Sequence, residues 1–151
     1  MIKIKIICIG KLHYKELYET SRRFEKMISG FSRLEILELP ESKRPYPRNL
    51  EDEKELILKH LRDEFFILLD REGEFLSSEE FAKIIKNNID SGKSISFLIG
   101  GHQGVSKDLK NKADFVLSFS KMTFGHNIFR IMLLEQIYRA LSIIFNTKYH
   151  K

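Results

Sequence analysis

Apolar and polar residues follow one regular pattern along the chain, in which short apolar runs alternate with longer amphipathic segments. The apolar runs lie at residues 2–9, 34–39, 65–69, 95–99 and 114–117, and they are rich in Ile, Leu, Val and Phe. Runs of this length and composition are typical of buried strands. Because they are short, largely apolar and separated by segments of helical length, they predict a mainly parallel sheet that is covered on both faces.

Most of the segments between these runs have the spacing of amphipathic helices, with apolar residues three or four positions apart. They predict helices at residues 14–28, 49–62, 77–89, 107–112 and 128–145. The resulting order, in which strand and helix alternate strictly, is typical of an α/β fold with helices on both faces of the sheet.

Two helix starts are marked by particular residues. Residues 40–49 hold all three prolines, which fix the backbone and disfavour helix in the residue before them, so this segment is predicted to be a loop. Asn49 could then cap the helix that follows. Ser77 opens the sequence S-S-E-E, which is typical of a capped helix start.

Three unusual segments come directly after predicted strands in the second half of the chain. They are Leu69-Asp70, Gly100-Gly101 and Ser118 to Asn127, which belongs to the stretch L-S-F-S-K-M-T-F-G-H-N. In parallel sheets, ligands bind at the carboxyl ends of the strands. The three segments therefore predict a binding site at this edge of the sheet.

The glycine-rich turn I-G-G-H-Q-G-V-S at residues 99–106 is open to two interpretations. Glycine lets a ligand approach the backbone closely, and the amides that follow could bind an anion. The spacing matches neither the P-loop nor the dinucleotide-binding G-x-G-x-x-G. Taken alone, the turn is better explained as purely structural, but its position beside residues 117–127 favours the ligand site.

Composition narrows the possible classes of protein. With 151 residues and 42% hydrophobic content, residues 1–151 are expected to form a single globular domain. The net charge of +5 favours a polyanionic partner such as nucleic acid, and a solvated lysine-rich surface explains it equally well. Cys8 is the only cysteine, so we expect a buried thiol in a cytoplasmic protein without disulfides. No apolar run reaches the length of a membrane span, and we expect no membrane or metal partner.

The predicted helix at residues 128–145 is apolar on nearly every side. Such a helix must be buried on all sides, and one sheet covers only one of them. We therefore expect a homodimer in which a second copy covers the rest. Among the polar exceptions, Glu135 and Arg139 are spaced to pair with each other, whereas Arg130 lies next to residues 117–127 and is expected to serve the site.

The sequences F-L-I-G-G-H-Q-G-V-S, L-S-F-S-K-M-T-F-G-H and R-x-x-L-x-E-Q-I-Y-R-A, with Y-H-K at the C-terminus, carry a family resemblance. They resemble the SPOUT-class methyltransferases that act on 23S ribosomal RNA, and more closely those that methylate N3 of a pseudouridine. The likeness spans the whole chain. It implies a deep C-terminal trefoil knot, which is an exception to the rule that chains avoid knots. It also implies a homodimer that uses S-adenosylmethionine and acts on 23S rRNA, in the assembled ribosome.

By the same resemblance, the loop before the last helix wraps the cofactor. Its backbone groups hold the adenine, and the side chains of Phe119, Met122 and Phe124 form apolar walls. The cofactor-binding residues that the family's motifs imply are Leu69, Gly100, Phe119, Ser120, Lys121, Met122, Thr123 and Phe124.

The resemblance also implies that the C-terminal tail of the partner subunit completes the catalytic site. N3 of pseudouridine must lose its proton during methyl transfer, and a base or a cation that stabilises the anion would assist. Tyr149 and His150 are the first candidates, and Arg130 and His126 are weaker ones. On composition alone, Tyr149-His150-Lys151 would be a disordered end.

Two positions depart from the family's pattern. Gly125 stands where proline is usual, which adds flexibility to the loop and would lower cofactor affinity, and His102-Gln103 replaces a small or acidic pair. Three alternatives stay open: a SPOUT methyltransferase that acts on another RNA such as tRNA, a non-catalytic RNA-binding dimer, and a flavodoxin-like nucleotide binder. The last would need a phosphate loop after the first strand, where I-G-K-L-H has a single glycine.

Overall fold

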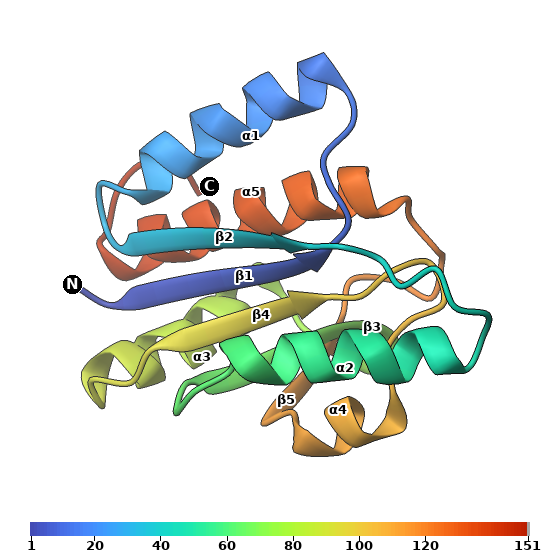
Figure 1. Ribbon diagram of the computed structural model, residues 1–151. Coiled ribbons are helices and arrows are strands. Elements are labelled where there is room, and N and C mark those ends of the chain that lie inside the picture. The colour runs from blue at the N-terminus through green and yellow to red at the C-terminus, as the bar shows by residue number, and fades with distance from the viewer. Residues whose placement is uncertain (151) are drawn as a thin grey trace.

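The structure is a computed structural model that describes residues 1–150, and Lys151 lies outside the described residues. One sheet runs through the molecule, and its strands are all parallel in the order β2-β1-β4-β3-β5 (Figure 1). This confirms the parallel sheet that the apolar runs predicted. The strands are β1 (Lys3–Ile9), β2 (Arg33–Leu39), β3 (Phe65–Phe75), β4 (Ile95–Ile99) and β5 (Phe115–Ser118).

Helices cover both faces of the sheet, as predicted. On one face α1, α3 and α5 pack against the strands, and α2 and α4 pack on the other (Figure 1). No helix within residues 1–150 is long and apolar enough to cross a membrane. The helices are α1 (Lys15–Ile28), α2 (Arg48–His60), α3 (Ser78–Asp90), α4 (Lys107–Lys112) and α5 (His126–Ile144).

The core consists of two apolar layers, because neighbouring side chains of a strand point to opposite faces of the sheet. In β1, Ile4, Ile6 and Cys8 belong to the layer beneath α1, α3 and α5, whereas Ile7 and Ile9 belong to the layer beneath α2 and α4. All five side chains are at most 2% exposed. Burying one isoleucine side chain contributes roughly 1.5–3 kcal/mol, so this central strand anchors both layers. The expectation that Cys8 is buried is confirmed.

The third strand is longer than its apolar run. The prediction ended at Leu69, but β3 continues to Phe75 after a shift of register that lets Glu74 and Phe75 pair with Leu117 and Ser118 of β5. The extension is polar in sequence, and the backbone of β5 gives it hydrogen-bonding partners that a hydrophobic pattern cannot reveal. The six residues after Leu69 therefore still belong to β3.

The two predicted caps have different outcomes. Ser77 caps α3 through a capping box, in which its hydroxyl accepts from the backbone N–H of Glu80 and the Glu80 carboxylate accepts from the N–H of Ser77. The prediction that Asn49 caps α2 is wrong, because α2 begins one residue earlier and Pro47 occupies the capping position. The Asn49 amide instead donates to Gln103 over 2.8 Å, so a tertiary partner replaces the local one.

The prediction of a disordered tail is wrong for Tyr149 and His150. The Tyr149 hydroxyl donates to the Glu135 carboxylate over 3.0 Å, and the ring of Tyr149 lies under the guanidinium of Arg139. The imidazole nitrogens of His150 lie 3.1 Å from Arg139 and 2.8 Å from Glu79. Charged partners on α3 and α5 hold this segment, and composition alone could not reveal them.

Candidate active site

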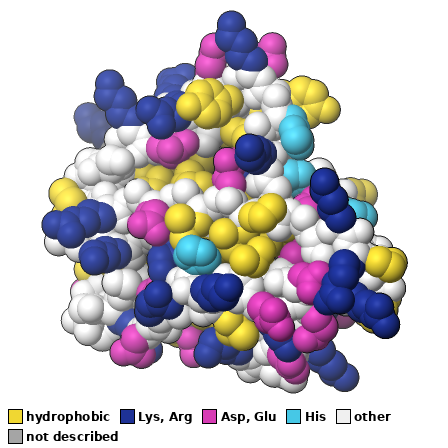
Figure 2. All heavy atoms as spheres, viewed as in Figure 1, with side chains coloured by type: hydrophobic (Ala, Val, Ile, Leu, Met, Phe, Trp, Pro, Cys, Tyr) yellow, Lys and Arg dark blue, Asp and Glu magenta, His cyan; other side chains and the backbone are white. Residues whose placement is uncertain are grey.

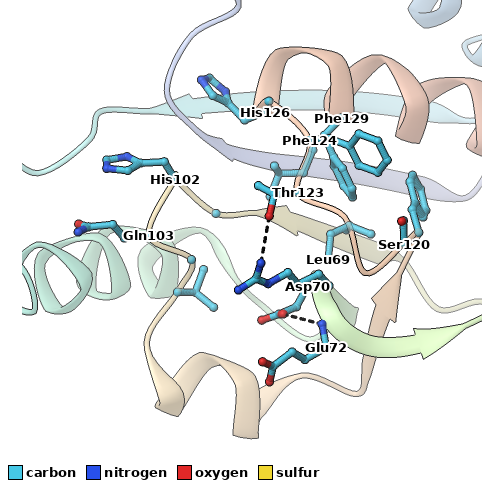
Figure 3. Close-up of a pocket in the computed structure, with 18 of the residues that line it drawn as sticks. Leu69, Asp70, Glu72, His102, Gln103, Ser120, Thr123, Phe124, His126 and Phe129 are labelled. Carbon is cyan, nitrogen blue, oxygen red and sulfur yellow. Dashed lines mark hydrogen bonds between the residues drawn. The ribbon is translucent and has the colours of Figure 1, made fainter.

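A cavity of about 610 Å³ lies at the carboxyl ends of β3, β4 and β5 (Figure 3). Residues 69–72, 99–105 and 119–126 contribute most of its wall. These are the segments that were expected to converge, and they do so because β4, β3 and β5 are neighbours in the sheet. A volume of this size is in the range of sites for small molecules and cofactors.

Most of the residues that the family's motifs implied for cofactor binding lie in the wall of this cavity. Lys121 is the exception, since its side chain is exposed and does not line the cavity. The lining members of the set are Leu69, Gly100, Phe119, Ser120, Met122, Thr123 and Phe124.

Close packing explains the glycine-rich turn after β4. A Cβ atom on Gly100 would lie 2.6 Å from a methyl carbon of Val105 and 3.0 Å from the carbonyl oxygen of Gly104, so no larger residue fits without movement. Gly104 has a φ of +77°, which glycine adopts without strain. The turn is therefore required by the backbone, and it also places Gly100 and Gly101 in the cavity wall.

Aromatic rings form the apolar side of the cavity. The rings of Phe119 and Phe129 stack with their centroids 4.8 Å apart, and the ring of Phe124 lies 6.5 Å from that of Phe129 (Figure 3). Phe129 belongs to α5, so the stack fixes the loop of residues 119–125 to the start of that helix. Sequence reasoning missed Phe129, although it lies five residues after Phe124 in an apolar helix.

Four charged residues face the other side of the cavity. The Asp70 carboxylate pairs with the Lys110 ammonium over 3.1 Å, and it also accepts from the backbone N–H of Glu72 over 3.0 Å (Figure 3). Arg71 crosses to the opposite loop and donates to the Thr123 hydroxyl over 3.1 Å. Sequence reasoning stopped at Asp70 and missed Arg71 and Glu72. The polar run after an apolar strand was the available signal.

His126, the first residue of α5, lines the cavity. Burial lowers the pKa of its imidazole below the usual value, and the carboxylate of Glu41 only partly offsets this effect. The imidazole is therefore neutral near pH 7 and able to accept a proton. It packs against Gly10, where a Cβ atom would lie 3.2 Å from the ring.

Arg130 lies behind the cavity and is not part of its wall. Only 3% of the residue is exposed, and its guanidinium pairs with Glu38 over 2.7 Å and donates to the carbonyl oxygen of Gly10 over 3.3 Å. These bonds join α5 to the carboxyl ends of β1 and β2. Arg130 therefore positions the start of α5, which carries His126.

Tyr149 and His150 do not line the cavity of their own chain. Tyr149 is held at Glu135, which is about 14 Å along α5 from His126 at a rise of 1.5 Å per residue. Burial and the bond to Glu135 raise the pKa of the Tyr149 phenol, which stays protonated.

Comparison with known proteins places this arrangement in a family. The family described as predicted SPOUT methyltransferases matches residues 2–150. A ribosomal RNA large subunit methyltransferase H from Caldicellulosiruptor bescii is 45% identical over 98% of this chain and 99% of the relative. Proteins of the same name from Clostridium botulinum and Malacoplasma penetrans are each 42% identical over 99% of this chain and all of the relative.

Solved structures share the fold at much lower sequence identity. A probable methyltransferase from Bordetella pertussis aligns with a TM-score of 0.57 at 11% identity, over 93% of this chain and 95% of that chain. A probable methylase family protein from Haemophilus influenzae aligns with a TM-score of 0.55 at 16% identity, over 95% of this chain and 66% of that chain. With the family match over nearly every residue and relatives above 40% identity, the chain belongs to the SPOUT methyltransferase family.

Proposed function

We propose that this protein transfers a methyl group from S-adenosylmethionine to N3 of a pseudouridine in 23S ribosomal RNA. The observation that carries the proposal is the cavity into which three separate strand ends bring the sequences that carry the family resemblance. Full-length similarity to relatives named ribosomal RNA large subunit methyltransferase H supports the class of substrate.

The residues of the cavity fit the proposed cofactor. Leu69 and the stacked rings of Phe119 and Phe129 offer an apolar wall to an adenine, and the backbone of residues 119–124 offers hydrogen-bonding groups beside it. When bound, S-adenosylmethionine supplies a methyl group that its sulfonium already activates. The tasks left to the chain are to orient the acceptor base and to take up its proton.

The proton of N3 has candidate acceptors on this chain. His126 lines the cavity and has a lowered pKa, so its neutral imidazole suits a base. Tyr149 and His150 are proposed to reach the cavity of the partner subunit, because in their own chain they are held along α5 away from it. Arg130 is proposed to act indirectly, by holding the start of α5 in place through its bond to Glu38.

A homodimer is part of the proposal. α5 is apolar on nearly every side, yet Ile128 and Phe145 at its two ends are 47% and 48% exposed, and Tyr14 and Tyr18 near the start of α1 are more than half exposed. Burying such surface against a second copy would remove it from water. The same association would bring the tail of one chain to the cavity of the other.

The proposal includes a trefoil knot in a single domain of residues 1–151. Its support is the close passage of two distant segments: a Cβ atom on Gly73 would lie 2.5 Å from the carbonyl oxygen of Val116, and the Ser118 hydroxyl lies 3.0 Å from the carbonyl oxygen of Arg71. Only glycine permits the first contact. We propose that residues 118–125 thread through the loop that follows β3.

The positive net charge of the chain is compatible with an RNA partner, but it does not identify a basic patch on the surface. In the view of Figure 2, Lys and Arg side chains are scattered over the face, and Asp and Glu side chains lie between them. The net charge of +5 therefore favours general attraction to phosphate, with salt-dependent affinity. We propose that the enzyme works in the cytoplasm on the assembled ribosome.

Transfer of a labelled methyl group to ribosomes tests the proposal. Ribosomes from cells that lack the modification are incubated with the protein and labelled S-adenosylmethionine, and ribosomes that also lack the pseudouridine are the control. Label in the large-subunit RNA of the first sample alone is expected. Label on tRNA instead would move the activity to another RNA, and cofactor binding without label on any RNA would indicate a silent RNA-binding dimer.

A further inference from the structure

We propose that Arg71 and Glu72 form a subsite for the amino-acid end of the cofactor, in which Arg71 binds its carboxylate and Glu72 faces its ammonium. The inference rests on the proposed function, since it takes S-adenosylmethionine as the ligand of the cavity. It assigns this part of the ligand to two residues in the bulge of β3, between Leu69 and Glu74.

The charges of the cavity carry the argument. Within the described residues, the cavity wall holds two carboxylates and two permanent cations, at Asp70, Arg71, Glu72 and Lys110. Asp70 and Lys110 neutralise each other over 3.1 Å. Among residues 1–150, Arg71 and Glu72 take part in no ion pair. The cavity thus presents one cation and one anion without partners, which is the complement of a zwitterion.

Arg71 is held in place from both of its ends. The Ser118 hydroxyl lies 3.0 Å from its carbonyl oxygen, and its guanidinium donates to the Thr123 hydroxyl over 3.1 Å (the dashed line at Thr123 in Figure 3). A guanidinium has five N–H donors, and the bond to Thr123 uses one of them. The others remain available to a carboxylate, which guanidinium binds through two parallel hydrogen bonds. Because the side chain is already positioned, binding costs less entropy.

The shape of the cavity fits this division of the ligand. The aromatic wall of Phe119, Phe124 and Phe129 suits the adenosyl part, while the charged wall at residues 70–72 of β3 suits the zwitterionic part. A ligand that keeps the adenosyl group and the sulfonium but lacks the carboxylate would leave Arg71 without its partner. The subsite therefore predicts discrimination between S-adenosylmethionine and its decarboxylated form.

Calorimetric titration of the full chain with both ligands tests the subsite. The wild-type protein is expected to bind S-adenosylmethionine about 10- to 100-fold more tightly than decarboxylated S-adenosylmethionine, the range typical of a charge-assisted hydrogen-bonded pair. Arg71→Met is expected to abolish this preference, with little change in affinity for the decarboxylated ligand. Arg71→Lys keeps the positive charge but loses the two parallel N–H donors of the guanidinium, and it is expected to retain part of the preference for S-adenosylmethionine.

Lys112→Met is the matched control, because it removes one exposed positive charge from the end of α4, outside the cavity wall. It is expected to keep the full preference. If Arg71→Met still binds the decarboxylated ligand, this binding also shows that the variant is folded. A preference that survives in Arg71→Met, or a wild-type protein without preference, would overturn the subsite and leave the cofactor proposal intact. Failure of the wild-type protein to bind either ligand would overturn both.

Discussion

At the scale of single residues, the buried guanidinium of Arg130 depends on its ion pair with Glu38. Glu38 is its only ion-pair partner within residues 1–150, at 2.7 Å. Removing that carboxylate would leave a buried charge uncompensated. We expect Glu38→Gln to lower the free energy of unfolding by roughly 1–3 kcal/mol at pH 7, toward the low end because the Glu38 side chain is 34% exposed. Urea denaturation measures it, and Glu35→Gln, an exposed residue of the same strand, should change little.

The same pair predicts how stability changes with pH. Burial alone would raise the pKa of Glu38, but hydrogen bonds from Arg130 and from the backbone N–H of Leu12 outweigh it and hold the pKa below the usual 4.5. A carboxyl group whose pKa is lower in the folded protein than in the unfolded chain stabilises the fold. This contribution is fully present above the pKa of the unfolded chain and is lost as the pH falls through the pKa of the folded protein. The stability difference between the wild type and Glu38→Gln should therefore be constant above about pH 5 and shrink below pH 4.5. Urea titrations from pH 3 to pH 8 would contradict this if the difference stayed constant.

Cys8 gives a prediction about reactivity. Burial is the main reason that the pKa of its thiol rises to about 11, and the nearby Arg130 only partly offsets it. Because the thiolate is the reactive form, labelling by an aromatic disulfide reagent at pH 8 should be very slow in the native protein and fast in urea. Rapid stoichiometric labelling without denaturant would show that β1 is open to solvent.

At the scale of elements, the loop before α5 carries the clearest departure from the family's pattern. Gly125 has a φ of −57°, which proline also adopts, and a Cβ atom there would meet nothing within 4 Å. Gly125→Pro should reduce the freedom of the unfolded chain and raise the free energy of unfolding by about 0.4–1 kcal/mol.

The loop that holds the cofactor in our proposal should also become more rigid in Gly125→Pro, so cofactor affinity is expected to rise. Thermal unfolding and calorimetric titration measure the two effects. Gly104→Pro is the contrasting variant, because its φ of +77° is closed to proline, and it should destabilise the turn. Lower stability in Gly125→Pro would mean that the loop needs a conformation that proline forbids.

Helices and strands could be predicted from the sequence where their hydrophobic pattern indicates which side chains are buried. All ten helices and strands within residues 1–150 were expected in the right order, because each buries one face or both. The extension of β3 to Phe75 was missed, since backbone pairing with β5 holds it and residues 70–74 are charged or glycine. For the same reason Arg71 and Glu72 were missed, whereas Leu69 and Phe119 came from motifs that the family resemblance supplied.

At the scale of the whole molecule, the position of the C-terminal tail decides whether a monomer or a homodimer can bring Tyr149 and His150 to a cavity. Tyr149 and His150 contact α5 and α3 of their own chain, on the half of α5 that is distant from the cavity. If the chain acts as a monomer, these residues must release their contacts with Glu135 and Glu79 to reach it. If it acts as the proposed homodimer, the tail can serve the cavity of the partner while it stays bound along α5.

Complementation between two variants separates these possibilities. His150→Ala impairs the tail, and Ser120→Trp is designed to fill the cavity with a bulky ring, so each homodimer should be nearly inactive. In a heterodimer, purified through two different tags, one cavity would combine an intact wall with the intact tail of the other subunit, and the second cavity would have neither. We expect about half of the wild-type methyl transfer in that heterodimer, since one of its two sites is whole. Action of the tail on its own chain would instead leave both cavities defective, and the heterodimer would be as inactive as either parent. The wild-type heterodimer with the same two tags sets the reference rate, and the measured fraction distinguishes a site shared between subunits from a site within one.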